Sequence, residues 1–419
     1  MPLGLYISVP FCRTKCSFCN FASGVFSEAA FENYVARLIE DIASIRRSVG
    51  QFDCKLEATS DSIVDSIYLG GGTPSILGPG QLGRIFAAAR QHFAITPDAE
   101  ITVECAPGTL SPTLIDTLLR CGVNRVSLGV QSFVDREAHS VGRLHNREIV
   151  LDEIGSLRES GLDNISIDLI AGLPHQTAES WAFSVAETIA TGVPHASVYM
   201  LEVDEDSRLG SELIAGGARY HAHFVPDDDA TADFYQHACL MLNDAGIVQY
   251  EISNFARGEG TGSKQSRHNL KYWTRQPYIG FGVDAHSMLP STKEKARAVR
   301  FATPDSLDAY MNRGPHTVAE VSRRAAMEEA FFLGLRLNRG IDLDELWKEF
   351  GKELGTEFAA EPAQLKAIRQ CVDDGLLEQR GAYLQLTPRG RLLSNEVFAR
   401  FLIGEKEETK VGTGHVNPR

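Results

Sequence analysis

The sequence lacks long apolar runs, and none reaches the roughly 18 residues that a membrane-spanning helix needs. We also expect no leader, because Met1–Leu5 runs directly into a strand-like segment that leaves no room for a signal or transit peptide. We therefore expect a cytoplasmic protein without a transmembrane segment.

Positive charge is scarce. The 419 residues include 41 Lys and Arg against 55 Asp and Glu, which gives a formal net charge of −14. An acidic balance keeps a protein soluble and argues against a surface devoted to nucleic acid, although it leaves room for a local basic pocket. We expect no nucleic-acid partner.

Cysteine lacks the regular spacing of a disulfide framework. Three of the eight cysteines fall within eight residues, at Cys12, Cys16 and Cys19. In a cytoplasmic chain this clustering indicates a metal site rather than disulfides. The other five are scattered: Cys54, Cys105, Cys121, Cys239 and Cys371.

The first half of the chain alternates short apolar runs with amphipathic segments, mostly at the roughly 30-residue spacing of βα units. Nearly continuous apolar strands predict a parallel sheet covered by helices. Six such units predict an α/β fold with a partial, open (β/α)6 barrel. The expected strands are Leu5–Val9, Ser66–Leu69, Glu100–Glu104, Arg125–Val130, Asn164–Ile170 and Ala196–Leu201. The expected helices are Glu28–Arg47, Pro79–Phe93, Ser111–Arg120, Arg147–Ser160 and Ala178–Thr191.

Polar or flexible residues stand where several of these strands end. Glu104 ends one expected strand, Gln131 follows another, Asp168 lies in a third, and Gly70–Thr73 come directly after Leu69. Because the chemistry of such barrels gathers at the carboxyl ends of the strands, we expect these residues at the active rim.

The later part of the chain has a different character. Its helical segments are followed by a hairpin around Gly381 and an expected closing helix, Thr387–Phe401, which predicts a winged-helix-like α+β domain. Such domains often bind DNA, but the acidic balance favours a structural or docking role. Before it, Asp204–Thr231 is expected to be a loop leading into a helix, Ala230–Ala245. We divide the chain into a barrel core (1–235), a core extension (236–303), the C-terminal domain (304–403) and a disordered polar tail (404–419).

The clustered cysteines form a C-x3-C-x2-C loop after the first strand. Iron–sulfur clusters take thiolate ligands, and three thiolates on a four-iron cube leave one iron open for chemistry. Arg13 and Lys15 add positive charge, which favours thiolates. A structural zinc ion is the alternative, but it needs a fourth ligand, and residues 20–53 contain no Cys or His. We expect Cys12, Cys16 and Cys19 to hold a [4Fe–4S] cluster.

This spacing resembles that of the radical-SAM superfamily, in which the open iron binds S-adenosylmethionine. Further motifs narrow the resemblance to the oxygen-independent coproporphyrinogen III oxidase family and, within it, to the HemW-like branch of haem chaperones. The motifs are Gly70-Gly-Gly-Thr-Pro74, Val103-Glu-Cys-Ala-Pro-Gly-Thr109, Arg125-Val-Ser-Leu-Gly-Val-Gln-Ser-Phe133, Gly142-Arg-Leu-His145, Ile167-Asp-Leu-Ile-Ala-Gly-Leu-Pro-His-Gln-Thr177, Tyr250-Glu-Ile-Ser-Asn-Phe255, Arg267-His-Asn-Leu-Lys-Tyr-Trp273 and Tyr278-Ile-Gly-Phe-Gly282.

The resemblance also implies which residues contact S-adenosylmethionine. Carboxylates can accept hydrogen bonds from ribose hydroxyls or the ammonium group, and an arginine fork can pair with a carboxylate. The alternatives are a salt bridge within the barrel for each carboxylate, a structural hydrogen bond for the glutamine or arginine, and core packing for the phenylalanine. The implied contacts are Tyr6, Phe18, Gly71, Gly72, Thr73, Glu104, Gln131, Arg143 and Asp168.

Two branches of the resembling family imply different functions. The oxidase branch has a further cysteine two residues after the third ligand and a longer N-terminal arm, whereas this chain has Phe21 and only eleven residues before Cys12. The chaperone branch has an HNxxYW motif, which here places His268, Tyr272 and Trp273 together. Imidazole is a common haem ligand, and in a helix His268 and Tyr272 would share a face. The alternative is a buried histidine with aromatic core neighbours.

These features favour a haem chaperone that binds a [4Fe–4S] cluster, S-adenosylmethionine and haem, and passes haem to an acceptor protein. The alternative is a coproporphyrinogen III oxidase that acts through a 5′-deoxyadenosyl radical in porphyrin biosynthesis. Whether the chain is an enzyme is open at this point.

Overall fold

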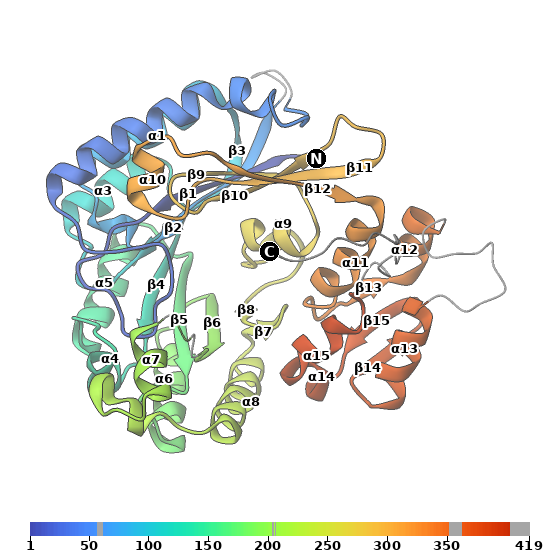
Figure 1. The fold of residues 1–419 in the computed structure, drawn as a ribbon. Helices are drawn as coiled ribbons and strands as arrows, with labels where there is room; N and C mark the ends of the chain where they lie inside the picture. The colour runs from blue at the N-terminus through green and yellow to red at the C-terminus, as the bar shows by residue number, and fades with distance from the viewer. Residues whose placement is uncertain (57–61, 203–204, 206, 352–362, 403–419) are drawn as a thin grey trace, which may run out of the picture.

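Six parallel strands form the centre of the computed structural model (Figure 1), which describes residues 1–56, 62–202, 205, 207–351 and 363–402. They follow one another across the sheet in chain order, each parallel to the next. In the described part of the chain the sheet does not close on itself. The expected open, partial (β/α)6 barrel is therefore confirmed. The six strands are β1 (Leu3–Val9), β2 (Ile63–Gly71), β3 (Ala94–Cys105), β4 (Arg125–Gln131), β5 (Ile165–Ala171) and β6 (His195–Met200).

Helices cover the outer face of this sheet, as Figure 1 shows. Helix α1 buries Phe31, Val35, Leu38 and Ile42, at the three- and four-residue spacing that places side chains on one helical face. The strands are buried on both faces, which explains their nearly continuous apolar sequences. All five expected helices are present: α1 (Glu28–Val49), α2 (Pro79–His92), α3 (Pro112–Arg120), α5 (Arg147–Glu159) and α6 (Ala178–Ala190). A short helix, α4 (Asp135–Ser140), follows β4.

The sheet continues beyond the barrel at both edges. Next to β1 lie β9 (Tyr278–Phe281), β10 (His286–Pro290), β11 (Ala296–Ala302) and β12 (Thr317–Ser322), and next to β6 lie β8 (Asn254–Ala256) and β7 (Val248–Gln249). Strand β9 is parallel to β1, and the other added strands pair antiparallel. The segment 236–303 thus contributes to both edges of the sheet, and β12 joins it from beyond the proposed boundary at 303.

Helix α9 (Arg267–Trp273) carries the HNxxYW motif and packs against β2 and against the C-terminal domain. Helix α8 (Asp228–Asp244) begins where expected, with the Asp227 side chain accepting a hydrogen bond from the backbone N–H of Ala230 at 2.8 Å. We expected the preceding stretch to be a loop, but it also contains helical segments. It contains α7 (Arg208–Ile214) and a 3-10 helix (Arg219–Phe224), because Ser207 caps α7 through the N–H of Gly210.

The C-terminal domain has its own hydrophobic core, in which the rings of Phe331 and Phe401 stack 4.6 Å apart. The expected hairpin turns at Gly381, whose φ is 63°. The expected single closing helix is wrong, because the backbone leaves the helical region at Leu393 (φ −104°, ψ 28°). The elements are α11 (Arg323–Gly334), β13 (Ile341–Asp342), α12 (Leu343–Phe350), α13 (Ala363–Asp373), β14 (Leu377–Arg380), β15 (Tyr383–Leu386), α14 (Pro388–Leu392) and α15 (Ser394–Ala399), while α10 (Leu307–Met311) precedes β12.

Two further expectations concern the C-terminal tail and membrane-spanning helices. The tail expected to be disordered, 404–419, lies outside the described residues. Of the helices that the structure describes, none has the length and apolar character to cross a membrane.

Candidate functional site

The three clustered cysteines lie on a loop that leaves the carboxyl end of β1. All three are free thiols and partly exposed. Backbone hydrogen bonds fix the loop: Cys12 N–H donates to the carbonyl of Gly24 at 2.9 Å, and Cys19 N–H donates to that of Cys16 at 3.2 Å. The described cysteines outside this loop are mostly buried in the core.

Each thiol has a polar neighbour. Thr73 Oγ1 lies 3.7 Å from Cys12 Sγ, Arg143 Nη1 lies 3.6 Å from Cys16 Sγ, and Ser23 Oγ lies 3.9 Å from Cys19 Sγ. Burial raises the pKa of the Cys12 thiol; hydrogen bonds from Ser23 and Thr73 oppose this, and the other two thiols raise the pKa further. Without a metal, the raised pKa keeps the Cys12 thiol protonated, so binding of a cationic centre would displace its proton.

This donor set fits an iron–sulfur cluster better than a single zinc ion. Among the described residues, no group of three or more His, Cys, Asp or Glu side chains is arranged to hold a single metal ion. Structural zinc draws four ligands to one ion, whereas each thiolate of a cluster binds a different iron. The three thiols of the loop are the donor type that an iron–sulfur cluster takes.

The glycine loop after β2 packs directly on the cysteine loop. Gly72 N–H donates to the carbonyl of Val9 at 2.8 Å, and Thr73 N–H donates to that of Phe11 at 2.7 Å. A side chain at Gly72 would come within 2.7 Å of the Phe11 carbonyl, and Gly71 has a φ of 103°. Glycine is required here because two backbones meet.

Two carboxylates face the inside of the barrel. Glu104 accepts hydrogen bonds from the Tyr68 hydroxyl at 2.8 Å and from Gly71 N–H at 3.1 Å. Burial raises the pKa of Glu104 to about 7, the Tyr68 hydrogen bond opposes the rise, and the charge of Asp168 adds to it. Glu104 is thus electrostatically coupled to Asp168, as expected for groups at one rim.

Serine hydroxyls surround Asp168. Ser127 Oγ donates to its two oxygens at 3.1 and 3.0 Å, and Ser166 Oγ lies 3.4 Å from Oδ1. Burial raises the pKa of Asp168, and hydrogen bonds from serines oppose the rise. Sequence reasoning missed these serines and Tyr68, although their alternation with apolar residues in β2, β4 and β5 placed them on one face of the sheet.

The remaining residues expected to contact S-adenosylmethionine surround the same rim. Gln131 ends β4 with a φ of 68°, an uncommon backbone conformation that is frequent at functional sites. Arg143 donates to the carbonyl of Gly129 as well as approaching Cys16, so it links β4 to the cysteine loop. Phe18 packs with a small apolar cluster of Val141, Ile170 and Leu173, which is the packing role weighed as its alternative.

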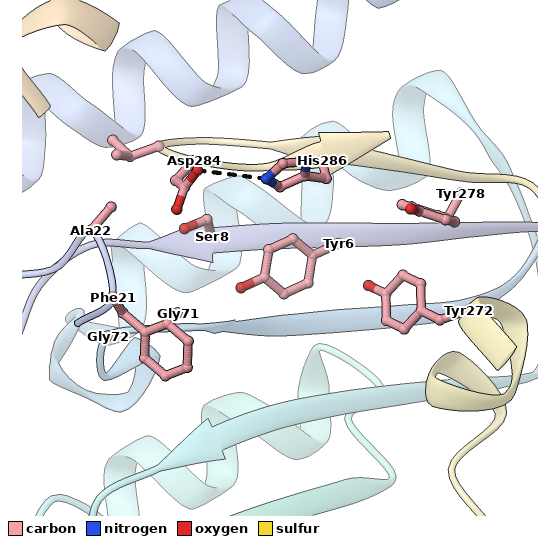
Figure 2. A pocket seen from close by; sticks show the side chains of 11 residues that line it. Tyr6, Ser8, Phe21, Ala22, Gly71, Gly72, Tyr272, Tyr278, Asp284 and His286 are labelled. Atoms are coloured by element: carbon pink, nitrogen blue, oxygen red, sulfur yellow. Dashed lines mark ion pairs between the residues drawn. The ribbon is translucent and has the colours of Figure 1, made fainter. Parts of the chain in front are cut away.

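Figure 2 shows a cavity beside the carboxyl ends of β1 and β2. Its volume is about 310 Å³. Tyr6, Tyr272 and Tyr278 line it with their rings, and the ring centroids of Tyr272 and Tyr278 lie 4.7 Å apart in an edge-to-face contact. Phe21 stands at its opposite side with 64% of its surface exposed. The lining also includes Gly71, Gly72, Asp284 and His286.

His268 and Tyr272 share a face of α9, as expected, but the histidine is turned into the protein. Its Nδ1 lies 3.1 Å from Ser66 Oγ and its Nε2 lies 2.9 Å from the Tyr272 hydroxyl. The residue is 1% exposed, and burial lowers its pKa to about 3. The imidazole is therefore neutral, and both of its nitrogens are occupied.

Trp273 points away from this cavity toward the C-terminal domain. The guanidinium carbon of Arg336 stands 4.1 Å above its ring, a cation–π contact. Arg275 continues the connection by donating to the carbonyl of Ala326 at 3.0 Å and to Glu349 at 3.1 Å. The three motif residues therefore have different environments: His268 is buried behind Tyr272, Tyr272 lines the cavity, and Trp273 contacts Arg336.

Comparison with known proteins identifies the family. The profile of the Radical SAM superfamily matches residues 6–185, and that of the HemN C-terminal domain matches residues 321–393. "Heme chaperone HemW" of Bacillus subtilis is 32% identical over 95% of this chain and 98% of its own. "Heme chaperone HemW" of Synechocystis is 31% identical over 97% of this chain and 98% of its own. The chain belongs to the HemW family.

A solved structure related to the HemW family supports the fold. The coproporphyrinogen III oxidase HemN from Escherichia coli superposes with a TM-score of 0.78 over 96% of this chain and 90% of its own, at 23% sequence identity. This similarity shows a shared fold. Membership of the Radical SAM superfamily implies a [4Fe–4S] cluster and S-adenosylmethionine as cofactors.

Proposed function

We propose that this protein is a haem chaperone, which binds a [4Fe–4S] cluster, S-adenosylmethionine and haem and passes the haem to an acceptor protein in the cytoplasm. Support comes from relatives named "Heme chaperone HemW", which align over nearly their whole length with this chain.

The observation that separates this function from the oxidase is the side chain at position 21. Phe21 occupies the position at which the oxidase branch is expected to have a further cysteine, and it projects into the mouth of the cavity. A phenyl ring can neither ligate metal nor transfer a proton. It offers instead a flat apolar surface, which suits the binding of a planar ligand.

The residues proposed for S-adenosylmethionine would act by binding and orientation. When bound, the cluster supplies one-electron chemistry to the sulfonium group. Glu104 and Asp168 would accept hydrogen bonds from ribose hydroxyls or the ammonium group, and Arg143 would pair with the carboxylate. The other proposed contacts are Tyr6, Phe18, Gly71, Gly72, Thr73 and Gln131.

The haem contacts proposed from the motif differ in their access to the cavity. Tyr272 lines it, whereas His268 stands behind Tyr272 and Trp273 faces Arg336. Direct coordination of iron by His268 would first require the 2.9 Å hydrogen bond to Tyr272 to break. The contribution of His268 that the geometry supports without rearrangement is to position the Tyr272 ring.

A parallel assay distinguishes the chaperone from the oxidase. Reconstituted protein is incubated with ferric haem in one series, and with coproporphyrinogen III, S-adenosylmethionine and a reductant in the other. The chaperone gives a saturable Soret shift and no protoporphyrinogen. Loss of two carboxyl groups from coproporphyrinogen over many turnovers would refute the proposal. A variant with Cys12, Cys16 and Cys19 all changed to alanine controls for turnover by contaminating enzyme.

A further inference from the structure

The cavity contains a second histidine that, unlike His268, has an accessible imidazole. His286 is the first residue of β10, and 68% of its side chain is exposed. In the part of the chain that the structure describes, neither of its ring nitrogens has a hydrogen-bond partner. Its Nε2 lies 3.6 Å from Asp284 Oδ1, so a carboxylate stands beside the ring without occupying it.

The segment that carries this pair is rigidly held. Asp284 has a φ of 53°, an unusual conformation for a residue other than glycine. Its N–H donates to the carbonyl of Pro304 at 2.8 Å, the N–H of Ala285 donates to Thr303 Oγ1 at 2.8 Å, and Thr303 Oγ1 donates to the carbonyl of Gly282. The Asp284–His286 pair therefore has a fixed backbone while its side chains remain open to the cavity.

Aromatic side chains line the cavity around His286, and a planar macrocycle can pack on such rings. The tyrosine rings at positions 6, 272 and 278 form one side of the cavity, and Phe21 forms the other. The volume of about 310 Å³ is at the lower end of the range for ligand pockets, so the cavity would enclose one edge of a macrocycle and leave the rest exposed. Partial enclosure suits a ligand that must be released to another protein.

We propose that His286 supplies an imidazole ligand to the iron of haem in this cavity, with Asp284 orienting the ring. The step is coordination alone: the lone pair of the neutral imidazole forms the bond to iron, and nothing is oxidised or reduced. A carboxylate beside a metal-binding imidazole fixes its orientation and increases its basicity. His268 acts as a positioning residue through Tyr272. This assignment rests on the proposed function, because it takes haem as the ligand.

Titration of the reconstituted full-length protein with ferric haem tests the assignment. His286→Ala should remove the spectral signature of an imidazole-ligated iron and weaken haem binding by at least about a hundredfold, because losing the ligand itself costs no less than losing an outer partner. Asp284→Asn should weaken binding by roughly tenfold and keep the signature. His237→Ala, an exposed histidine of α8, is the matched control and should bind as the wild type does.

Chemical rescue supplies a second readout that a structural role for His286 would not produce. His286→Gly in the presence of free imidazole should regain the imidazole-ligated absorption and electron paramagnetic resonance signals, while His237→Gly should show no response. Cluster absorption and far-ultraviolet circular dichroism confirm that each variant is folded.

The outcomes separate the two proposals. If the wild type binds no haem, the proposed function and this assignment both fail. If the wild type binds haem and His286→Ala gives the same affinity and spectrum, the assignment is overturned while the chaperone function stands. Loss of the signature in His268→Ala, with retention in His286→Ala, would likewise overturn it and identify the buried histidine as the ligand.

Discussion

Replacing Glu104 by glutamine should alter the pH dependence of stability in a defined direction. Burial raises the pKa of Glu104 from 4.5 to about 7 in the folded protein. The folded state therefore binds a proton more tightly than the unfolded chain, and stability falls as the pH rises from about 4.5 to about 7. Glutamine keeps an oxygen for the Tyr68 hydroxyl and Gly71 N–H but cannot ionise, so this loss disappears.

The pKa difference sets the size of the effect. At about 1.4 kcal/mol per pH unit, it amounts to roughly 3 kcal/mol, and partial contact with solvent reduces this to on the order of 2 kcal/mol. Chemical unfolding of the cluster-loaded protein without S-adenosylmethionine, followed by circular dichroism between about pH 5 and about pH 8, measures it. As the pH rises across this window, the free energy of unfolding should fall less for Glu104→Gln than for the wild type. Parallel pH profiles for the two proteins would show that Glu104 ionises normally and refute the reasoning.

The same substitution tests the cofactor role of Glu104. A cation held by its carboxylate lowers the pKa of the acid, so the wild type should bind S-adenosylmethionine more tightly as the pH rises through about 7. The amino group of the ligand titrates in both proteins, so the difference between wild type and Glu104→Gln isolates the carboxylate. An identical pH dependence of affinity would place the cofactor away from Glu104.

Three further predictions concern the cluster and its supports. Changing Cys12, Cys16 and Cys19 to alanine should remove the visible absorption of the reconstituted protein, whereas single changes of Cys54, Cys105, Cys121, Cys239 or Cys371 should retain it; loss in any of these five would contradict the ligand assignment. Gly72→Ala should lower the iron content because its Cβ would lie 2.7 Å from the Phe11 carbonyl, while Gly83→Ala in α2, with open space around it, should leave iron unchanged and stabilise the helix by about 1 kcal/mol. Arg143→Leu should make the cluster potential more negative by on the order of 50 mV, since about 1 kcal/mol of attraction to the cluster is lost; an unchanged midpoint in a redox titration would argue that the guanidinium does not act on Cys16.

The barrel could be predicted from the sequence because its strands are buried on both faces. Continuous apolar runs such as Ile165–Ala171 have few structural alternatives, and the chain order of the six strands follows from the preference for parallel neighbours. The antiparallel additions could not be placed in the same way. Strand β12 joins the sheet through pairing with β11, and nothing local in its exposed sequence specifies that partner.

The candidate site was predictable in its residue types but not in its hydrogen bonds. The cysteine spacing and the ends of the strands led us to expect the cysteine loop, Glu104 and Asp168 at one rim, and the structure places Glu104 within electrostatic reach of Asp168. The hydrogen bonds of the Tyr68 and Ser127 hydroxyls were not predicted, because the sequence of a strand does not show which buried group a polar side chain will contact. For His268 the helical spacing correctly paired it with Tyr272, yet spacing alone could not show that this pairing uses a nitrogen that iron would need.

The position of β1 inside the sheet has a consequence for synthesis. The strand lies between β2 and β9, so that Gly4 pairs with Tyr278 on one side and Ser66 on the other. Because proteins are made from the amino terminus, the first strand must wait for most of the barrel and the extension to leave the ribosome before both of its edges are covered. Pairing over such a separation is slow. The cysteine loop that follows β1 therefore acquires its final surroundings late, and delivery of iron and sulfide is better timed to the completed chain than to the nascent one.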